Sequence, residues 1–213
     1  MIFEIEMKIY VKKVLISFFV IFTILSVKTI YSDSKKKSTK FTSKLVRAAI
    51  ERTEFNIVYD GSYVSIKYPN GDVPANRGVC TDVIIRSYRR LGIDLQVLVH
   101  EDMLKNFQAY PAKRIWGQKK PDSNIDHRRV PNLQTFFTRK GTVLKISNSG
   151  KNYHPGDIVT WLLPGNLPHI GIVTNIASKD HRRPLIVHNI GSGTVLEDIL
   201  FSYKITGHYR FRK

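Results

Sequence analysis

A lone cysteine gives this sequence its clearest chemical signal. Cys80 is the only cysteine among 213 residues, so it cannot form a disulfide within the chain. Segment 78–85 opens an apolar, periodic run that predicts a helix. We expect Cys80 in the first turn of that helix, where the positive end of the helix dipole favours the reactive thiolate. The alternative is a buried cysteine that packs as a small hydrophobe.

Two histidines could serve such a thiol as bases. His169 and His188 lie at the edges of apolar, strand-like runs, and adjacent antiparallel strands can place them side by side. A histidine can accept the thiol proton near neutral pH, and a third polar group should orient its ring. Strand alternation puts His188 and Asn189 on opposite faces, so only one of them can take that orienting role. The alternatives are a surface histidine at 169 and a core histidine at 188.

The order of predicted elements indicates an α+β fold. Helices come first in the chain and strands follow, which favours helices packed on a C-terminal antiparallel sheet. The nucleophile then lies at a helix N-terminus. The predicted helices are 42–53, 79–91, 97–107 and 133–139, and the predicted strands are 57–59, 63–67, 143–146, 157–163, 170–176, 185–189 and 206–211.

The start of the chain has the pattern of an export signal. Residues 1–33 combine lysines with an apolar run, which predicts a signal peptide, or alternatively an uncleaved N-terminal anchor. The lysine-rich segment 34–44 is typical of a flexible basic tether. Residues 45–213 then form one domain, with an insert at about 97–149. We therefore expect a periplasmic or cell-envelope protein, with membrane tethering if the first segment is retained. In the oxidising environment outside the cytoplasm, a free thiol is a liability. Its presence in an exported protein therefore indicates that its chemistry is used.

The charge of the chain indicates which partners it could attract. The formal net charge is +17 at pH 7, and such a field attracts polyanions, including anionic wall polymers and membrane surfaces. We expect no nucleic acid partner, because no nucleic-acid-binding motif is present. The sequence also lacks a metal-ligand pattern and a glycine-rich phosphate loop. We therefore expect no metal and no cofactor.

Several segments of the sequence resemble known families. Gly78-Val79-Cys80-Thr81-Asp82-Val83, His169-Ile170-Gly171-Ile172-Val173 and His188-Asn189-Ile190-Gly191 resemble the domain-of-unknown-function 1287 (DUF1287) family of exported bacterial proteins. More broadly, the chain is similar to NlpC-type, papain-like cysteine hydrolases. That resemblance implies Cys80 as nucleophile, His169 as base and His188 as orienting residue. It also implies that Tyr68, in Tyr68-Pro69-Asn70-Gly71, joins the oxyanion hole with the backbone N–H of Cys80.

The sequence departs from the NlpC pattern around the cysteine. Val79 precedes it where that family usually has Asp, and Thr81 and Asp82 follow it where Ser-Gly is usual. These flanking residues are expected to affect substrate orientation. The insert adds Asp126, Arg128 and Arg129, and adjacent arginines suit bidentate capture of a substrate carboxylate. The alternative is an ion pair between Asp126 and an arginine that pins the loop.

Two functions follow from these expectations. The first is an exported cysteine amidase or peptidase that hydrolyses an amide bond in cell-wall peptide (peptidoglycan) through a Cys-His-His or Cys-His-Asn triad. The second is a non-catalytic, cationic module on the same fold that binds the cell wall or another polyanion. Acyl transfer to an amine would use the same residues as hydrolysis.

Overall fold

The computed structural model describes residues 39–212. The chain divides into two units, Met1–Phe41 and Thr42–Lys213, and all the elements discussed below belong to the second. The predicted signal or anchor, residues 1–33, lies outside the described residues. Within the described part of the chain, no helix combines the length and the apolar character that a membrane span requires. Within the second unit, residues 42–51 are helical, so the last residues of the tether predicted for 34–44 are helical.

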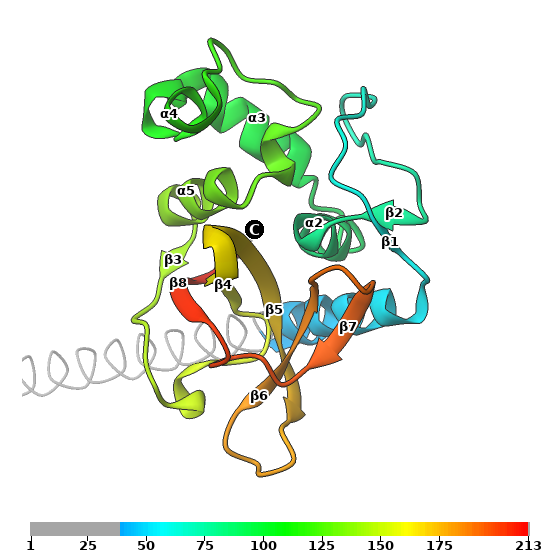
Figure 1. Cartoon of the computed structure of the whole chain (residues 1–213), viewed down its shortest axis with the longest axis vertical. Helices are drawn as coiled ribbons and strands as arrows, with labels where there is room; N and C mark the ends of the chain where they lie inside the picture. The colour runs from blue at the N-terminus through cyan, green and yellow to red at the C-terminus, as the bar shows by residue number, and fades with distance from the viewer. Residues whose placement is uncertain (1–38, 213) are drawn as a thin grey trace, which may run out of the picture. The chain divides into compact units, whose positions relative to one another are not determined.

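Helices dominate the first half of this unit and strands the second (Figure 1). The α-helices after the first are α2 (Cys80–Arg89), α3 (Leu95–Asn106), α4 (Ala112–Trp116) and α5 (Val130–Lys140). The strands are β1 (Val58–Tyr59), β2 (Arg77–Gly78), β3 (Thr142–Val143), β4 (Ile158–Leu163), β5 (Leu167–Ala177), β6 (Pro184–Asn189), β7 (Thr194–Glu197) and β8 (Lys204–Arg210). Short 3₁₀ turns are η1 (Arg52–Glu54), η2 (Phe107–Ala109), η3 (Asp126–Arg128), η4 (Gly150–Asn152) and η5 (Pro164–Asn166).

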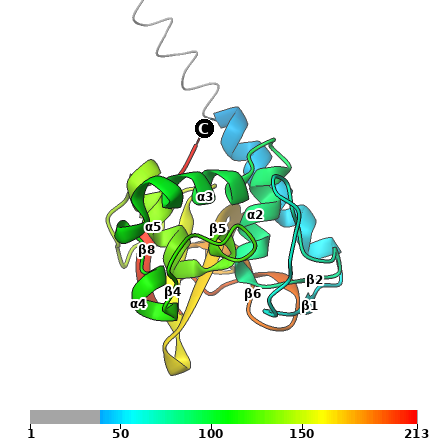
Figure 2. The same cartoon turned by 90° about the horizontal axis from the view of Figure 1, so that it is seen from above.

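A six-stranded antiparallel sheet is the centre of the fold. Its strand order is β3-β8-β4-β5-β6-β7, and every neighbouring pair is antiparallel. Helix α2 packs against β5 and β6, and α5 packs against β3, β5 and β8. Figure 2 shows the helices gathered over the strands. The predicted α+β class, with helices on an antiparallel sheet, is confirmed.

Helix α2 forms where its apolar periodicity and its N-terminal cap agree. Asp82 accepts a hydrogen bond from the backbone N–H of Val79 at 2.7 Å, which satisfies one of the free donors at the helix start. Nine of its ten residues are buried. At the other end, Gly92 adopts a φ of +77°, a left-handed conformation that glycine takes without steric cost.

The face of β4 that looks away from α5 carries an apolar core. Thr160 bonds to Gln134 of α5, and alternate residues of a strand point to opposite faces. Val159 and Trp161 therefore face away from α5, and the Trp161 ring donates to the Leu200 carbonyl at 3.0 Å. The buried members of this cluster are Tyr153, Val159, Trp161, Val173, Ile186, Ile199 and Leu200.

Three parts of the prediction differ from the structure. Residues 63–67 are not a strand, and β1 instead pairs in parallel with β2. Strand β7 was absent from the predicted elements. Helix α4 was also absent from the predicted elements, whereas the two helices predicted within the insert correspond to α3 and α5. Through α5 the insert also packs against the sheet.

Candidate active site

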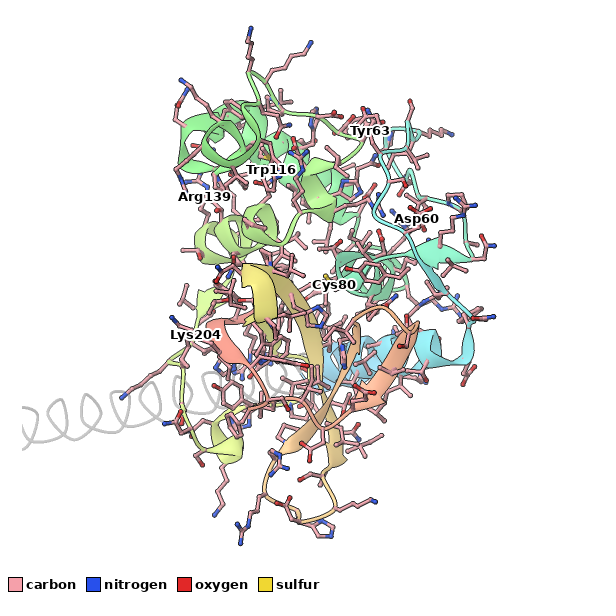
Figure 3. All side chains as sticks on the ribbon, in the orientation of Figure 1. Asp60, Tyr63, Cys80, Trp116, Arg139 and Lys204 are labelled. Atoms are coloured by element: carbon pink, nitrogen blue, oxygen red, sulfur yellow. The ribbon has the colours of Figure 1, made fainter. Side chains whose placement is uncertain are left out.

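The thiol of Cys80 lies where α2 meets β5. Cys80 is the first residue of α2 and is 5% exposed. Burial raises the pKa of Cys80 to about 12, although the backbone N–H of Ile170 lies close enough to favour the thiolate. Ile170 directly follows His169. Figure 3 labels Cys80 in the centre of the view, between α2 and β5.

The two predicted histidines meet across strands β5 and β6. His169 Nε2 lies 3.1 Å from His188 Nδ1, and the ring planes are perpendicular, with centroids 5.1 Å apart. His188 Nε2 in turn lies 3.2 Å from Glu197 Oε2 on β7. Because Nε2 of His169 is occupied by His188, its Nδ1 is the ring nitrogen that His188 leaves open. Within the described residues, no hydrogen bond joins the Cys80 sulfur to the His169 ring.

Burial keeps the thiol and the imidazoles neutral. It lowers the pKa of His169 to about 3, and the neighbouring His188 adds to this effect. The pKa of His188 is also lowered by burial, while Glu197 opposes that shift. The resting site therefore holds a thiol and an imidazole. This reverses the thiolate predicted from the helix dipole, because desolvation outweighs the dipole at so buried a position.

The geometry distinguishes His188 from Asn189 as the candidate that orients the His169 ring. His188 contacts the His169 ring, whereas Asn189 Oδ1 accepts a hydrogen bond from the backbone N–H of Gly191 at 3.1 Å. Asn189 thus shapes the turn after β6. Of the two candidates for the orienting role, the structure brings only His188 to His169.

The structure places the Tyr68 ring against helix α3. Its ring packs edge-on against His100 of α3, with centroids 5.2 Å apart, and the side chain is 41% exposed. Tyr59 on β1 is 45% exposed and is the tyrosine whose pKa responds to the thiol. Its pKa is raised by burial and then by the negative charge that Cys80 and Asp82 would carry.

The residues that follow Cys80 hold the local backbone together. Thr81 Oγ1 donates to the Arg128 carbonyl at 3.0 Å. Asp82 receives Arg128 Nε and Nη2 at 3.0 and 2.9 Å, and both side chains of this pair are almost fully buried. Arg128 also donates to the carbonyls of Asp60 and Ser62. Buried partners thus engage Thr81, Asp82 and Arg128, which favours a structural role for these groups, and their predicted substrate roles stay predictions.

The remaining residues of the predicted loop site are also engaged. Asp126 is buried and accepts from Gln118 Nε2 at 2.9 Å. Arg129 donates to Gln118 Oε1 at 2.6 Å, and its guanidinium lies 4.0 Å from the centre of the Trp116 ring. Asp126 and Arg129 are 4.0 Å apart at their charged atoms. The loop is therefore held by the ion pair between Asp126 and Arg129, as in the alternative interpretation. Arg128 does not pair with Asp126, because it pairs with Asp82.

Two residues of the site were not found from the sequence. Glu197 lies on β7, a strand of only four residues, and Tyr59 depends on the parallel pairing of β1 with β2. The only available signal for Tyr59 was its position just before the Asp60-Gly61 turn. Among the described residues there is no group of three or more side chains that could hold a metal ion.

Comparison with known proteins identifies the protein family to which the chain belongs. The family described as "Domain of unknown function (DUF1287)" matches residues 46–211, so the chain belongs to the DUF1287 family. Over 155 residues it is 52% identical to the uncharacterized protein YijF of Escherichia coli (strain K12), and the match covers 73% of this chain and 74% of that protein. The predicted membership of DUF1287 is confirmed.

Proposed function

We propose that this protein is an exported, thiol-dependent amidase or peptidase that acts on cell-wall peptide, with an NlpC-type, papain-like arrangement of its site. One observation carries the proposal. The thiol at the start of α2 lies against the backbone N–H of Ile170, and the adjacent His169 is hydrogen-bonded through Nε2 to His188. The sulfur thus lies beside the strand that carries His169, and His188 from a third element contacts that ring, which supports the nucleophile, base and orienting roles that thiol hydrolases require.

The reaction begins from a neutral pair. The Sγ proton of Cys80 passes to Nδ1 of His169 as the sulfur attacks the substrate carbonyl and the C=O electrons move onto oxygen. His188, backed by Glu197, stabilises the imidazolium that forms. The C–N bond then breaks, and His169 returns its proton to the leaving amine. Water, activated by His169, finally releases the acyl group.

The developing oxyanion needs donors near the sulfur. The N–H groups at the start of an α-helix have no partner within the helix and point toward its N-terminus. Cys80 is the first residue of α2, so its own backbone N–H is placed for this role. Tyr59, whose pKa is affected by Cys80, is the side chain we assign to the same part of the site.

The test is turnover of purified wall fragments. Wild-type protein should release new amino groups from peptidoglycan peptides, and Cys80→Ala and His169→Ala should abolish the release. A matched control is Lys204→Ala, an exposed residue of β8, which should leave turnover unchanged. Equal release by wild type and Cys80→Ala would refute the proposal. Added free amines would show whether acyl transfer competes with hydrolysis.

A non-catalytic cationic wall-binding module is the second candidate, and the raised pKa of the buried thiol favours it. It predicts binding to wall polymers that weakens steeply with salt and is unaffected by Cys80→Ala. Wall binding that does not respond to salt would count against it.

A further inference from the structure

A groove of about 1000 Å³ lies beside helix α5. It runs between α5 and the segment that contains η2 and α4, the pair of helices at upper left in Figure 1. Arg139, labelled in Figure 3, lies between these two segments. Cys80, His169 and His188 are not among the residues that line it. The groove is therefore a separate feature of the domain.

One wall of the groove is cationic. Lys113 and Arg114 lie in the last turn of α4, are exposed, and form no ion pair with another described residue. Arg139 adds a third cation, although its Nε is bonded to Asp102 at 2.6 Å. Within the described part of the chain, no carboxylate lines the groove. The two unpaired cations therefore favour a ligand with negatively charged groups.

The opposite wall presents hydrogen-bond acceptors. The hydroxyls of Thr135 and Thr138 donate to helix carbonyls at 3.1 and 2.8 Å, so their remaining capacity is to accept. Gln134 uses its amide N–H groups on Thr160 and Thr206, so its Oε1 is the atom that can accept, a capacity shared with the neighbouring Tyr209 hydroxyl. A ligand that satisfies this wall must carry N–H or O–H donors. A simple phosphate chain carries few donors and would leave the wall unmatched.

The groove is connected to the strand that bears the candidate base. Gln134 bonds to Thr160 at 2.9 Å, and Thr160 is the cross-strand partner of Ile170. The backbone N–H of Ile170 is the group that lies at the Cys80 sulfur. One strand spacing, roughly 4.8 Å, thus separates the backbone under the groove from the strand at the thiol.

We propose that this groove binds a short acidic peptide. The side-chain carboxylates would face Lys113 and Arg114, and the peptide N–H groups would face the acceptors of Gln134, Thr135 and Thr138. A peptide combines both requirements, because it carries a donor at every residue and a carboxylate at each acidic one. The inference concerns a binding site beyond the proposed thiol chemistry, and the two can fail independently.

Binding should be measured by calorimetry with full-length Cys80→Ala protein, which removes turnover from the measurement. The probe is a blocked peptide of alternating alanine and glutamate. Lys113→Ala combined with Arg114→Ala should weaken its binding by at least about tenfold, since two exposed charge-assisted contacts are lost. The control pair Lys119→Ala and Lys120→Ala, exposed cations outside the groove, should leave the Kd within about twofold. Thermal unfolding of both variants verifies that they are folded.

Two further probes test the acceptor wall. The same peptide with its backbone nitrogens methylated keeps the carboxylates but loses the donors, and it should bind at least about fivefold more weakly. Inorganic polyphosphate should bind less tightly than the acidic peptide at equal ionic strength. Tighter binding of polyphosphate, or equal binding of methylated and unmethylated peptides, would overturn the proposal. A loss of binding that is the same in the control pair would also overturn it.

Discussion

Arg128 and Asp82 form a buried, two-pronged ion pair across 46 positions of sequence. Asp82 also caps the first turn of α2 through the backbone of Val79. The pair therefore fixes the turn that carries Cys80 to the 3₁₀ turn η3. The carbonyls of Asp60 and Ser62, which also bind Arg128, extend the same anchor to the segment after β1.

Breaking this pair should cost far more stability than breaking a surface pair. Asp82→Ala leaves the Arg128 guanidinium buried without its partner, and we expect a loss of about 3–5 kcal/mol in the free energy of unfolding. Arg77→Ala removes a pair with Asp60 in which Arg77 is 55% exposed, and it should cost under about 1 kcal/mol. Urea unfolding monitored by fluorescence measures both.

An opposite result would restore the binding role predicted for Arg128. If Arg128→Ala were as stable as Arg77→Ala while KM for wall peptide rose, the arginine would be a substrate contact. A double replacement by apolar residues, Asp82→Leu with Arg128→Met, provides an additional comparison. It should be less destabilising than either single change, because no unpaired charge remains buried.

The resting thiol should react slowly with alkylating reagents. Because burial raises the pKa of Cys80 to about 12, the thiolate fraction rises with pH without reaching a plateau below that value. The rate with iodoacetamide should increase about tenfold per pH unit from roughly pH 7 to pH 10. His169→Ala should leave this profile unchanged, since no imidazolium stabilises the thiolate at rest. A plateau below about pH 7 that disappears in His169→Ala would instead reveal an ion pair.

Glu197 should support His188 without taking part in bond formation. Its carboxylate opposes the effect of burial on the pKa of His188, so its negative charge favours an imidazolium beside His169. Glu197→Gln should lower kcat for wall peptide on the order of tenfold, equivalent to about 1.4 kcal/mol in the barrier. The pKa of His188 followed by NMR should fall further in this variant. Glu101→Gln, an exposed change on α3, is the control, and an unchanged kcat with an unchanged histidine signal would contradict the assignment.

Buried histidines should make the protein sensitive to mild acid. Burial lowers the pKa of His127 from 6.5 to about 3, with Arg128 adding to the effect. Below pH 6.5 the unfolded chain binds a proton that the folded chain does not, so stability present above that pH falls as pH drops toward 3. Each such histidine adds about 1.4 kcal/mol per pH unit to the slope of the unfolding free energy against pH.

The contribution of His127 can be isolated between pH 6.5 and about pH 4.5, above the range in which carboxylates titrate. In this window, His127→Leu should reduce the slope of the unfolding free energy against pH by about 1.4 kcal/mol per pH unit. His154→Leu changes an exposed histidine and should leave the slope as it is. An identical slope in His127→Leu and wild type would show that His127 is already protonated in the folded state.

The parts of the fold that the sequence predicts are those set by local periodicity. Apolar spacing located α2, α3 and the long strands within a few residues, and strand alternation correctly separated His188 from Asn189. What depends on contacts between distant segments was not accessible. The partner of Arg128 lies 46 positions away, and Tyr59 reaches the site only because β1 pairs with β2.

Electrostatic properties of the site were also not accessible from composition. The dipole argument for Cys80 needs only the start of a helix, whereas its pKa depends on how much solvent the packed strands exclude. Glu197 was missed because β7 is short and lies between the glycines of 191–193 and the turn at 199–202, where no alternating pattern develops. The groove beside α5 likewise arises only once the helices of the insert are arranged.

The sheet ends on both sides in short strands, and this has a consequence for how molecules meet one another. Strand β3 has two residues and β7 has four, whereas the inner strand β5 has eleven. A long open border would present a row of free peptide groups on which a second molecule could align and aggregate. Here the outermost strands are short, and since β3 covers only Tyr209 and Arg210 of β8, the strand backbone left open to a second copy is confined to short stretches. The long inner strands β5 and β6, which carry His169 and His188, are paired on both sides and so are not themselves available to another copy.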